Sequence, residues 1–313
     1  MKFVDVKNDI AFHKIFGNAN KTVSLISFLN AVLHLDGSDK VVTATIENPY
    51  LFPPVPSGKT SIIDVRATDQ EGRKFIIEMQ VGEKAGFDKR VQYYTSRDYA
   101  SQIERGDEYG KLRPTYFIAI LDFVFTQSPN YLSIHQTIDI ETGEHLLKDV
   151  KYYFIELQKF HKKMEDLVDM IDKWIFFIKN AERLKVIPVN VDDEGLKTAY
   201  EEADKQTWTK AEMNAYDDSF VREADAVQAL LWATQKGEAK GKAEGKAEGK
   251  AEGKAEGKAE GKAEGKAEGK AEGIIEAVLG MHQIGIAIPL IAKSLKMTEA
   301  EVQIILDSND EAI

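Results

Sequence analysis

Two acidic residues and one amide lie on two consecutive strand-like segments in the first third of the chain. Between residues 73 and 81, apolar and polar side chains alternate, which predicts a half-buried strand with Glu78 and Gln80 on one face. The preceding segment, residues 61–68, is expected to place Ile62, Asp64 and Arg66 together on one face. The linking sequence Asp-Gln-Glu-Gly at 69–72 is typical of a turn. The pattern therefore predicts a hairpin with a carboxylate on each strand.

Asp64 and Glu78 are expected to be close neighbours across this hairpin. One turn geometry places Asp64 across from Ile77 and a tighter one places it across from Met79, so it lies within one residue of Glu78 in both cases. Two carboxylates about 5 Å apart beside apolar side chains repel each other unless they are protonated or bridged by a cation. Mg²⁺ or Mn²⁺ suits such a pair, because oxygen ligands and retained waters leave room for a phosphate oxygen and an attacking water. The alternative is that both acids line the solvent-facing side of an exposed hairpin.

The composition limits the kind of site and the kind of protein. The 313-residue chain has no cysteine, which excludes disulfides and thiolate zinc sites, and its six histidines show no ligand spacing. With 43% apolar and 30% charged residues and no long apolar run, it is expected to be globular and to make no membrane contact. The N-terminus lacks the apolar core of a secretory signal, which predicts a cytoplasmic location. A net charge of −11 argues against broad affinity for nucleic acid, but it leaves room for a local basic patch.

Helices and strands alternate around the acidic pair in an order typical of an α/β protein. Helices are predicted at about 9–16, 20–35, 86–105, 164–184 and 198–236, and strands at 41–47, 61–68, 74–81, 116–125 and within 131–154. Asn8 or Asp9 is expected to cap the first helix and Asn20 the second. This order indicates a mixed sheet sandwiched by helices.

The second half of the chain contains the sharpest change in composition. Residues 237–273 are almost entirely Gly-Lys-Ala-Glu repeated in fours. A helix there would carry a glycine in every turn, at about 1 kcal/mol each relative to alanine, and would stack like charges at i,i+4. We therefore predict a solvated, partly helical tether between two structured regions.

Apolar patterning resumes after the repeats. A helix is predicted up to residue 282, a turn at Gly285, a second helix at about 289–295, and a third capped by Thr298, whose spacing to Glu301 fits a capping box. This arrangement resembles a helix-turn-helix. Both a DNA-reading module and a small cap that packs or forms homo-oligomers are compatible with it.

The acidic pair also carries a resemblance to a known family. Asp64, thirteen residues and then Glu-x-Gln resembles the PD-(D/E)XK nuclease pattern, with Asp64 as the first acid, Glu78 as the second and Gln80 where lysine usually stands. The likeness extends to the bacterial PD-(D/E)XK nuclease family transposases, also called recombination-promoting nucleases (the Rpn family). The segments that carry it are KNDIAFHKIFG at 7–17, IDVRA at 63–67, GRKFIIEMQ at 72–80, KRVQYY at 89–94 and GDEYGKLRP at 106–114.

The resemblance implies a restriction-endonuclease-like fold and a Mg²⁺-dependent endonuclease that hydrolyses DNA phosphodiesters in recombination or transposition of mobile DNA. Asp64 and Glu78 would bind the metal together with the Met79 carbonyl, provided that the strand ladder loosens there. Gln80 departs from the pattern, because glutamine forms hydrogen bonds where lysine supplies a charge. The missing lysine and the acidic net charge keep open a second interpretation, which is a catalytically weak or inactive DNA-binding or assembly protein on the same fold.

Four further residues are candidates near this site. Such folds often place an additional acid on a short N-terminal helix, and Asp9 holds that position unless it is an ordinary helix cap. Arg90, Gln92 and Tyr94 lie on the helix after the Glu-x-Gln strand and are candidates for contacts with the DNA backbone. The alternative is that Arg90 lies on a solvated face and Tyr94 in the core.

Four parts are thus expected along the chain. They are a nuclease-like core at 1–150, a mainly helical extension at 151–236, the repeat tether at 237–273 and a small helical tail at 274–313.

Overall fold

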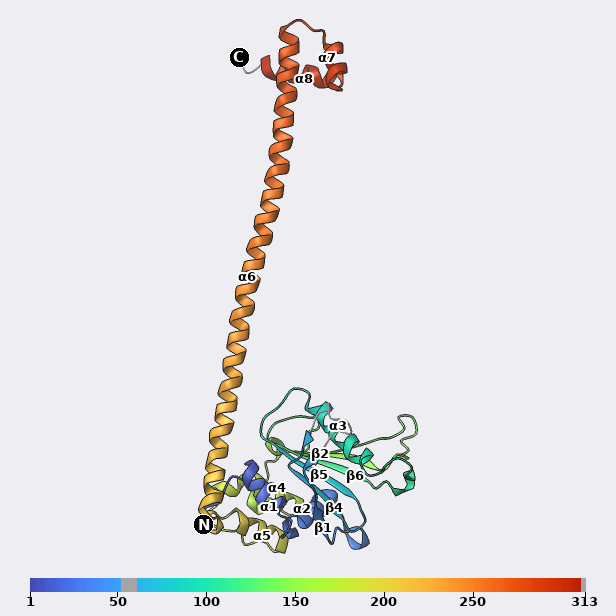
Figure 1. The fold of residues 1–313 in the computed structure, drawn as a ribbon, viewed down its shortest axis with the longest axis vertical. Helices are drawn as coiled ribbons and strands as arrows, with labels where there is room; N and C mark the ends of the chain where they lie inside the picture. The colour runs from blue at the N-terminus through green and yellow to red at the C-terminus, as the bar shows by residue number, and fades with distance from the viewer. Residues whose placement is uncertain (52–60, 311–313) are drawn as a thin grey trace. The chain divides into compact units, whose positions relative to one another are not determined.

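The structure is a computed structural model that describes residues 1–51 and 61–310 (Figure 1). It contains two compact units, Met1–Asp225 and Ala226–Ile313. Six strands of the first unit form one sheet in the order β1-β4-β5-β6-β8-β7. These strands are β1 (Ala44–Ile46), β4 (Val65–Asp69), β5 (Lys74–Gln80), β6 (Thr115–Leu121), β7 (Leu132–Gln136) and β8 (Val150–Glu156). The strands β2 (Tyr50–Leu51) and β3 (Ser61–Ile62) pair separately.

The sheet is mixed, as the order of elements predicts. Strands β1, β4 and β5 are antiparallel, β5, β6 and β8 are parallel, and β7 runs antiparallel to β8. Helix α3 (Phe87–Ala100) connects the parallel neighbours β5 and β6. Strand β8 lies inside the sheet and the main core extends to Tyr216, so residues 151–216 share their sheet and core with residues 1–150.

Helices cover both faces of the sheet, which explains why its central strands are so apolar. One face, which includes Phe75, Ile77 and Met79, packs against four helices. They are α1 (Asp9–Phe16), α2 (Val23–Leu33), α4 (Met170–Asn180) and α5 (Glu194–Ala203). The opposite face, which includes Ile76 and Phe117, packs against α3. Glu78 and Gln80 alternate with Met79 and therefore lie on the α3 side.

The segment 61–68 is not the single strand that its pattern predicts. The chain is interrupted between β3 and β4, at Ile63 and Asp64, where the Ile63 N–H donates to the Pro49 carbonyl at 3.0 Å. Ile62 is exposed and Ile63 is buried against α3. The expectation that Ile62 shares a face with Asp64 and Arg66 is therefore wrong, because the backbone turns before β4 begins.

Two predicted helix boundaries also need correction. Asn20 does not cap α2, because the Asn20 and Lys21 N–H groups both bond to Asn18 and form a turn before the helix begins at Val23. The helix predicted over 198–236 is broken, because the Asp204 side chain accepts the Gln206 N–H and starts a separate turn. At the first helix Asn8 is the cap, with its side chain accepting the Ile10 N–H at 3.0 Å.

The C-terminal unit contains the helices that its pattern predicts. Its helices are the distal part of α6 (Lys210–Gln283), α7 (Ile288–Leu295) and α8 (Glu299–Asp310). Val278 packs with Ile291 and Val302 in a small core, and Thr298 and Glu301 form the expected capping box. The role of these helices in assembly or DNA binding stays a prediction. None of the helices within 1–51 and 61–310 is long and apolar enough to cross a membrane.

The repeat segment 237–273 is helical throughout rather than partly helical, and all of its residues are exposed. It therefore buries no apolar surface that would offset the glycine in every turn.

Deleting four repeat units, residues 242–257, is expected to leave the melting temperature of the first unit unchanged, because no residue of the array is buried. Calorimetry of the full-length and shortened chains checks this. A fall of more than about 2–4 °C, which corresponds to roughly 1 kcal/mol for a unit of this size, would show that the array stabilises the fold.

Candidate active site

The hairpin of β4 and β5 brings Asp64 opposite Glu78. The strands pair from Thr68 and Lys74 to Val65 and Ile77, and continuing that register by one step places Asp64 across from Glu78. The two predicted partners of Asp64, Ile77 and Met79, are therefore each wrong by one residue. The predicted proximity of Asp64 to Glu78 is confirmed.

The turn explains the difference in register. The Asp69 N–H donates to the Arg73 carbonyl at 3.2 Å, and Asp69 Oδ1 accepts the N–H groups of Glu71 and Arg73 at 3.0 and 2.9 Å. Gly72 adopts a φ of 78°, a conformation that favours glycine. The turn therefore uses one residue more than a pairing of Thr68 with Arg73 would allow.

The Asp64 side chain takes the place of a ladder bond at the end of the hairpin. Its Oδ2 accepts the Met79 N–H at 2.8 Å, while the backbone of Ile63 has already turned toward Pro49. The N–H and carbonyl of one strand residue point to the same side, so the Met79 carbonyl also faces Asp64. The backbone pairing of β4 with β5 thus ends before Met79, which is the condition for the predicted role of the Met79 carbonyl as a metal ligand.

Glu78 is a buried carboxyl with an unsatisfied oxygen. Its side chain lies on the α3 face of the central strand β5 and is 5% exposed. Within the described residues, its Oε1 has no hydrogen-bond partner. A buried polar atom without a partner is unusual and costs about 1–3 kcal/mol, which points to a group that binds there.

Burial and neighbouring negative charge raise the pKa of both carboxyls. Burial is the main cause that raises the pKa of Glu78, and the negative charge of Asp64 raises it further. Burial also raises the pKa of Asp64, whereas its hydrogen bond from Met79 lowers it. The positive charges of Arg90 and Lys84 lower both pKa values without cancelling the effect of burial. The pair therefore tends to retain a proton unless a cation is present.

Asp9 lies near this pair, in the first turn of α1. Because Asn8 is the helix cap, the interpretation of Asp9 as the cap is wrong. Its negative charge raises the pKa of Asp64, and its side chain is exposed. Asp9 thus acts electrostatically on Asp64 from an exposed position, and its role as an accessory acid stays a prediction.

Gln80 and Arg90 form a pair beside the carboxyls. Gln80 is 7% exposed, and its Oε1 accepts a hydrogen bond from Arg90 Nη2. The Arg90 guanidinium also lies over the rings of Phe87 and Tyr94, at 5.1 and 5.9 Å from their centroids. Arg90 therefore faces the sheet rather than only the solvent.

The other two residues considered on α3 differ in exposure. Gln92 is exposed, and its amide donates to the Asp88 carbonyl at 3.2 Å. Tyr94 is 9% exposed and belongs to the core between α3 and the sheet. The structure therefore brings Arg90 to the acidic pair, leaves Gln92 at the surface, and places Tyr94 beneath Arg90.

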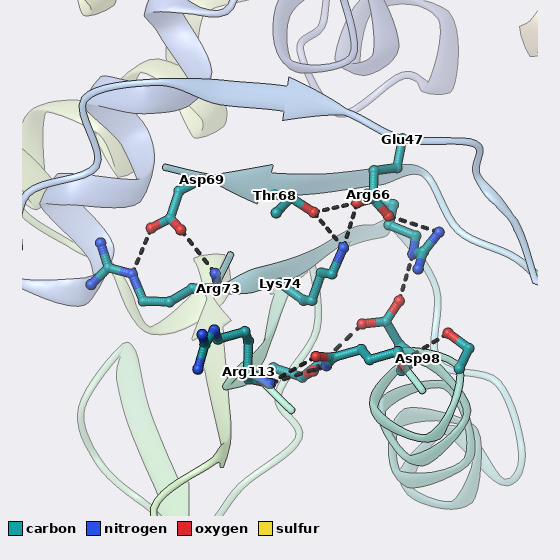
Figure 2. Close-up of polar contacts among 11 residues, drawn as sticks. Glu47, Arg66, Thr68, Asp69, Arg73, Lys74, Asp98 and Arg113 are labelled. Carbon is teal, nitrogen blue, oxygen red and sulfur yellow. Dashed lines mark hydrogen bonds and ion pairs between the residues drawn. The ribbon is translucent and has the colours of Figure 1, made fainter. Parts of the chain in front are cut away.

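An ionic network fixes the far end of α3 to the hairpin (Figure 2). Arg66 on β4 pairs with Asp98 on α3 and, at 2.8 Å, with Glu47. Lys74 on β5 donates to the same Glu47 carboxylate at 2.6 Å. Asp98 is completely buried, so the loss of Arg66 would leave an unpaired buried charge, a change that typically costs about 3–5 kcal/mol. This network holds the helix that carries Arg90 against the strand that carries Glu78.

Sequence analysis missed Lys84, the Gln80–Arg90 pair and the Arg66–Asp98 pair. A signal for the last two was present, because Arg90 and Asp98 continue the helical spacing of the apolar residues Phe87, Val91 and Tyr94. Charged residues inside such a stripe are buried only when they are paired.

The residues present fit a hard divalent cation. Among the residues that the structure describes, no three or more His, Cys, Asp or Glu side chains gather as a candidate metal site. Mg²⁺ is usually held by one or two carboxylates together with waters and substrate phosphates, and Asp64, Glu78 and the Met79 carbonyl offer a set of that kind. The unsatisfied Glu78 Oε1 supports this fit.

The fold and the acidic hairpin are those of a nuclease-type α/β protein, and the comparison with known families agrees. The family model described as PD-(D/E)XK nuclease family transposase matches residues 6–233. The chain therefore belongs to the PD-(D/E)XK nuclease family transposases, and its mixed sheet with flanking helices is consistent with the restriction-endonuclease-like α/β fold. No curated protein and no solved structure matches the chain significantly.

Metal-free wild type is expected to lose stability relative to Glu78→Gln as the pH rises. The folded Glu78 has a raised pKa, whereas the unfolded side chain titrates near its usual value of about 4.3. At a pH above the unfolded pKa, the folded state therefore binds more protons than the unfolded state. The stabilisation from Glu78 is complete at a pH below the unfolded pKa, and it is lost as the pH rises through the folded pKa.

Melting temperatures in a chelating buffer, measured from about pH 4 upward, check this expectation. The two curves should diverge with rising pH, at about 2–4 °C per kcal/mol. Parallel curves would mean that Glu78 titrates normally in the folded chain.

Proposed function

We propose that this chain is a Mg²⁺- or Mn²⁺-dependent DNA endonuclease that acts in recombination or transposition of mobile DNA. The observation that carries the proposal is the pairing of the half-buried Asp64 with the buried Glu78, whose Oε1 has no hydrogen-bond partner among the described residues, in a member of a nuclease family. A solvent-facing hairpin would not bury Glu78 to 5% exposure.

Each residue of the site then has a chemical role. Asp64, Glu78 and the Met79 carbonyl would hold the cation, which when bound acts as a Lewis acid and lowers the pKa of a bound water. Gln80 would orient Arg90 through their hydrogen bond, and Asp9 would act as an accessory acid through its charge near Asp64. In the hydrolysis, a bond forms between a water oxygen and phosphorus, and the bond from phosphorus to one sugar oxygen breaks. One water proton ends on that sugar hydroxyl, and the other stays with the new phosphate monoester.

Three cations near the start of α3, Lys84, Lys89 and Arg90, support contact with DNA phosphates despite the acidic chain. A cavity of about 720 Å³ is lined by Lys84, Lys89, Arg90 and Tyr93, among others, and Lys89 pairs with the neighbouring Asp88 at 3.9 Å. Phosphate contacts made by Lys and Arg supply most of the affinity for nucleic acid. Arg90 and the exposed Gln92 fit such contacts, whereas the buried Tyr94 would act by supporting Arg90.

Purified wild type is expected to nick supercoiled plasmid when Mg²⁺ or Mn²⁺ is added, and Asp64→Ala is expected to lose this activity. Gel electrophoresis of the plasmid forms over a range of salt concentrations provides the measurement. Equal absence of nicking in both proteins at every salt concentration would instead support a non-catalytic DNA-binding or assembly protein.

Metal binding itself is expected to show in the melting temperature. Millimolar Mg²⁺ should raise the melting temperature of wild type, because the cation binds only the folded pair. Asp64→Asn retains an oxygen that can accept the Met79 N–H, so it should melt higher than wild type without metal and respond less to Mg²⁺. An undiminished Mg²⁺ response in Asp64→Asn would exclude Asp64 as a ligand.

A further inference from the structure

The site needs a positive charge that its strand residues do not carry. Phosphodiester hydrolysis concentrates negative charge on the phosphate oxygens, and fixed cationic donors stabilise that charge. Gln80 has no charge, and Asp64, Glu78 and Asp9 are all acidic. Arg90 and Lys84 are the positive residues whose charges act on both Asp64 and Glu78.

Arg90 is held more firmly than a surface arginine. Its Nη2 donates to Gln80, and its guanidinium stacks over Phe87 and Tyr94. A guanidinium has five N–H donors, so the bond to Gln80 leaves others free to meet a ligand. Arg90 is only half-buried and lines the cavity at the start of α3, where a ligand can reach it. Fixed orientation and access together are what binding of a phosphate group requires.

We propose that Arg90 is a catalytic residue of this site, which binds the scissile phosphate and stabilises its developing negative charge, and that Gln80 positions the guanidinium. The inference rests on the proposed nuclease function. Arg90 on α3 supplies the positive charge that is missing from β5, and its hydrogen bond to Gln80 joins the two elements.

The first test compares Arg90→Ala with Arg105→Ala in the full-length chain. Arg105 is an exposed arginine in the loop after α3, so its loss changes the net charge equally. In single-turnover cleavage at saturating DNA, Arg90→Ala should be slower than wild type by about 10²–10³-fold, the usual effect of losing one charge-stabilising donor. Arg105→Ala should cleave like wild type, and Arg90→Lys should lose less than Arg90→Ala because it retains a charge.

Metal affinity separates a catalytic role from a structural one. Removing a cation beside two carboxylates should leave the Mg²⁺-induced rise in melting temperature intact in Arg90→Ala, or move it to lower Mg²⁺ concentration. A merely structural Arg90 would instead lose both cleavage and the metal response, and that result would overturn the proposal.

Moving the positive charge from position 90 to position 80 provides the most direct test. Adding Gln80→Lys to Arg90→Ala returns a positive charge to the site from the strand. The double variant should cleave at least about tenfold faster than Arg90→Ala, a difference equivalent to about 1.4 kcal/mol. The proposal is overturned if Arg90→Ala cleaves as fast as Arg105→Ala, or if the double variant is no faster than Arg90→Ala. If wild type cleaves DNA in either case, the proposed nuclease function is unaffected. If wild type shows no metal-dependent cleavage, both the nuclease function and the role of Arg90 are excluded.

Discussion

The pairing of a buried carboxyl, Glu78, with a half-buried one, Asp64, sets the constraint around which this site is built. Asp64 and Glu78 face each other at the open end of the β4–β5 hairpin, and burial makes charging both of them unfavourable. A proton or a cation can relieve the repulsion. The unsatisfied Glu78 Oε1 favours the cation, because a carboxylate oxygen is a hard donor of the kind that Mg²⁺ prefers.

The surrounding elements hold the two carboxyls in place and leave access to them. The apolar face of β5 is buried under four helices, so the strand cannot rotate Glu78 toward solvent without exposing Phe75, Ile77 and Met79. On the other face, the Arg66–Asp98 pair anchors the far end of α3, and the Gln80–Arg90 pair anchors the part of it that borders the site. One strand thus serves both stability and chemistry, because Phe75, Ile77 and Met79 pack under four helices while Glu78 and Gln80 lie on the other face.

The sequence predicts the mixed sheet and the proximity of the two acids, because strand alternation and the turn at 69–72 are local properties. It does not predict the exact register, since that depends on how the Asp69 side chain closes the turn. It also misses the break at Ile63, whose N–H bonds to a carbonyl far along the chain, and the Gln80–Arg90 contact. These features depend on tertiary packing, which short-range patterns do not encode.

The proton held by the carboxyl pair gives the most direct test of this account. Calorimetric titration of the full-length chain with Mn²⁺ near neutral pH, in two buffers with different ionisation enthalpies, measures the protons released when the cation binds. The account predicts net proton release from wild type, because the cation displaces the proton that the raised pKa of Glu78 retains, and no such release from Glu78→Gln. Binding to wild type without proton release, or equal release from Glu78→Gln, would contradict it.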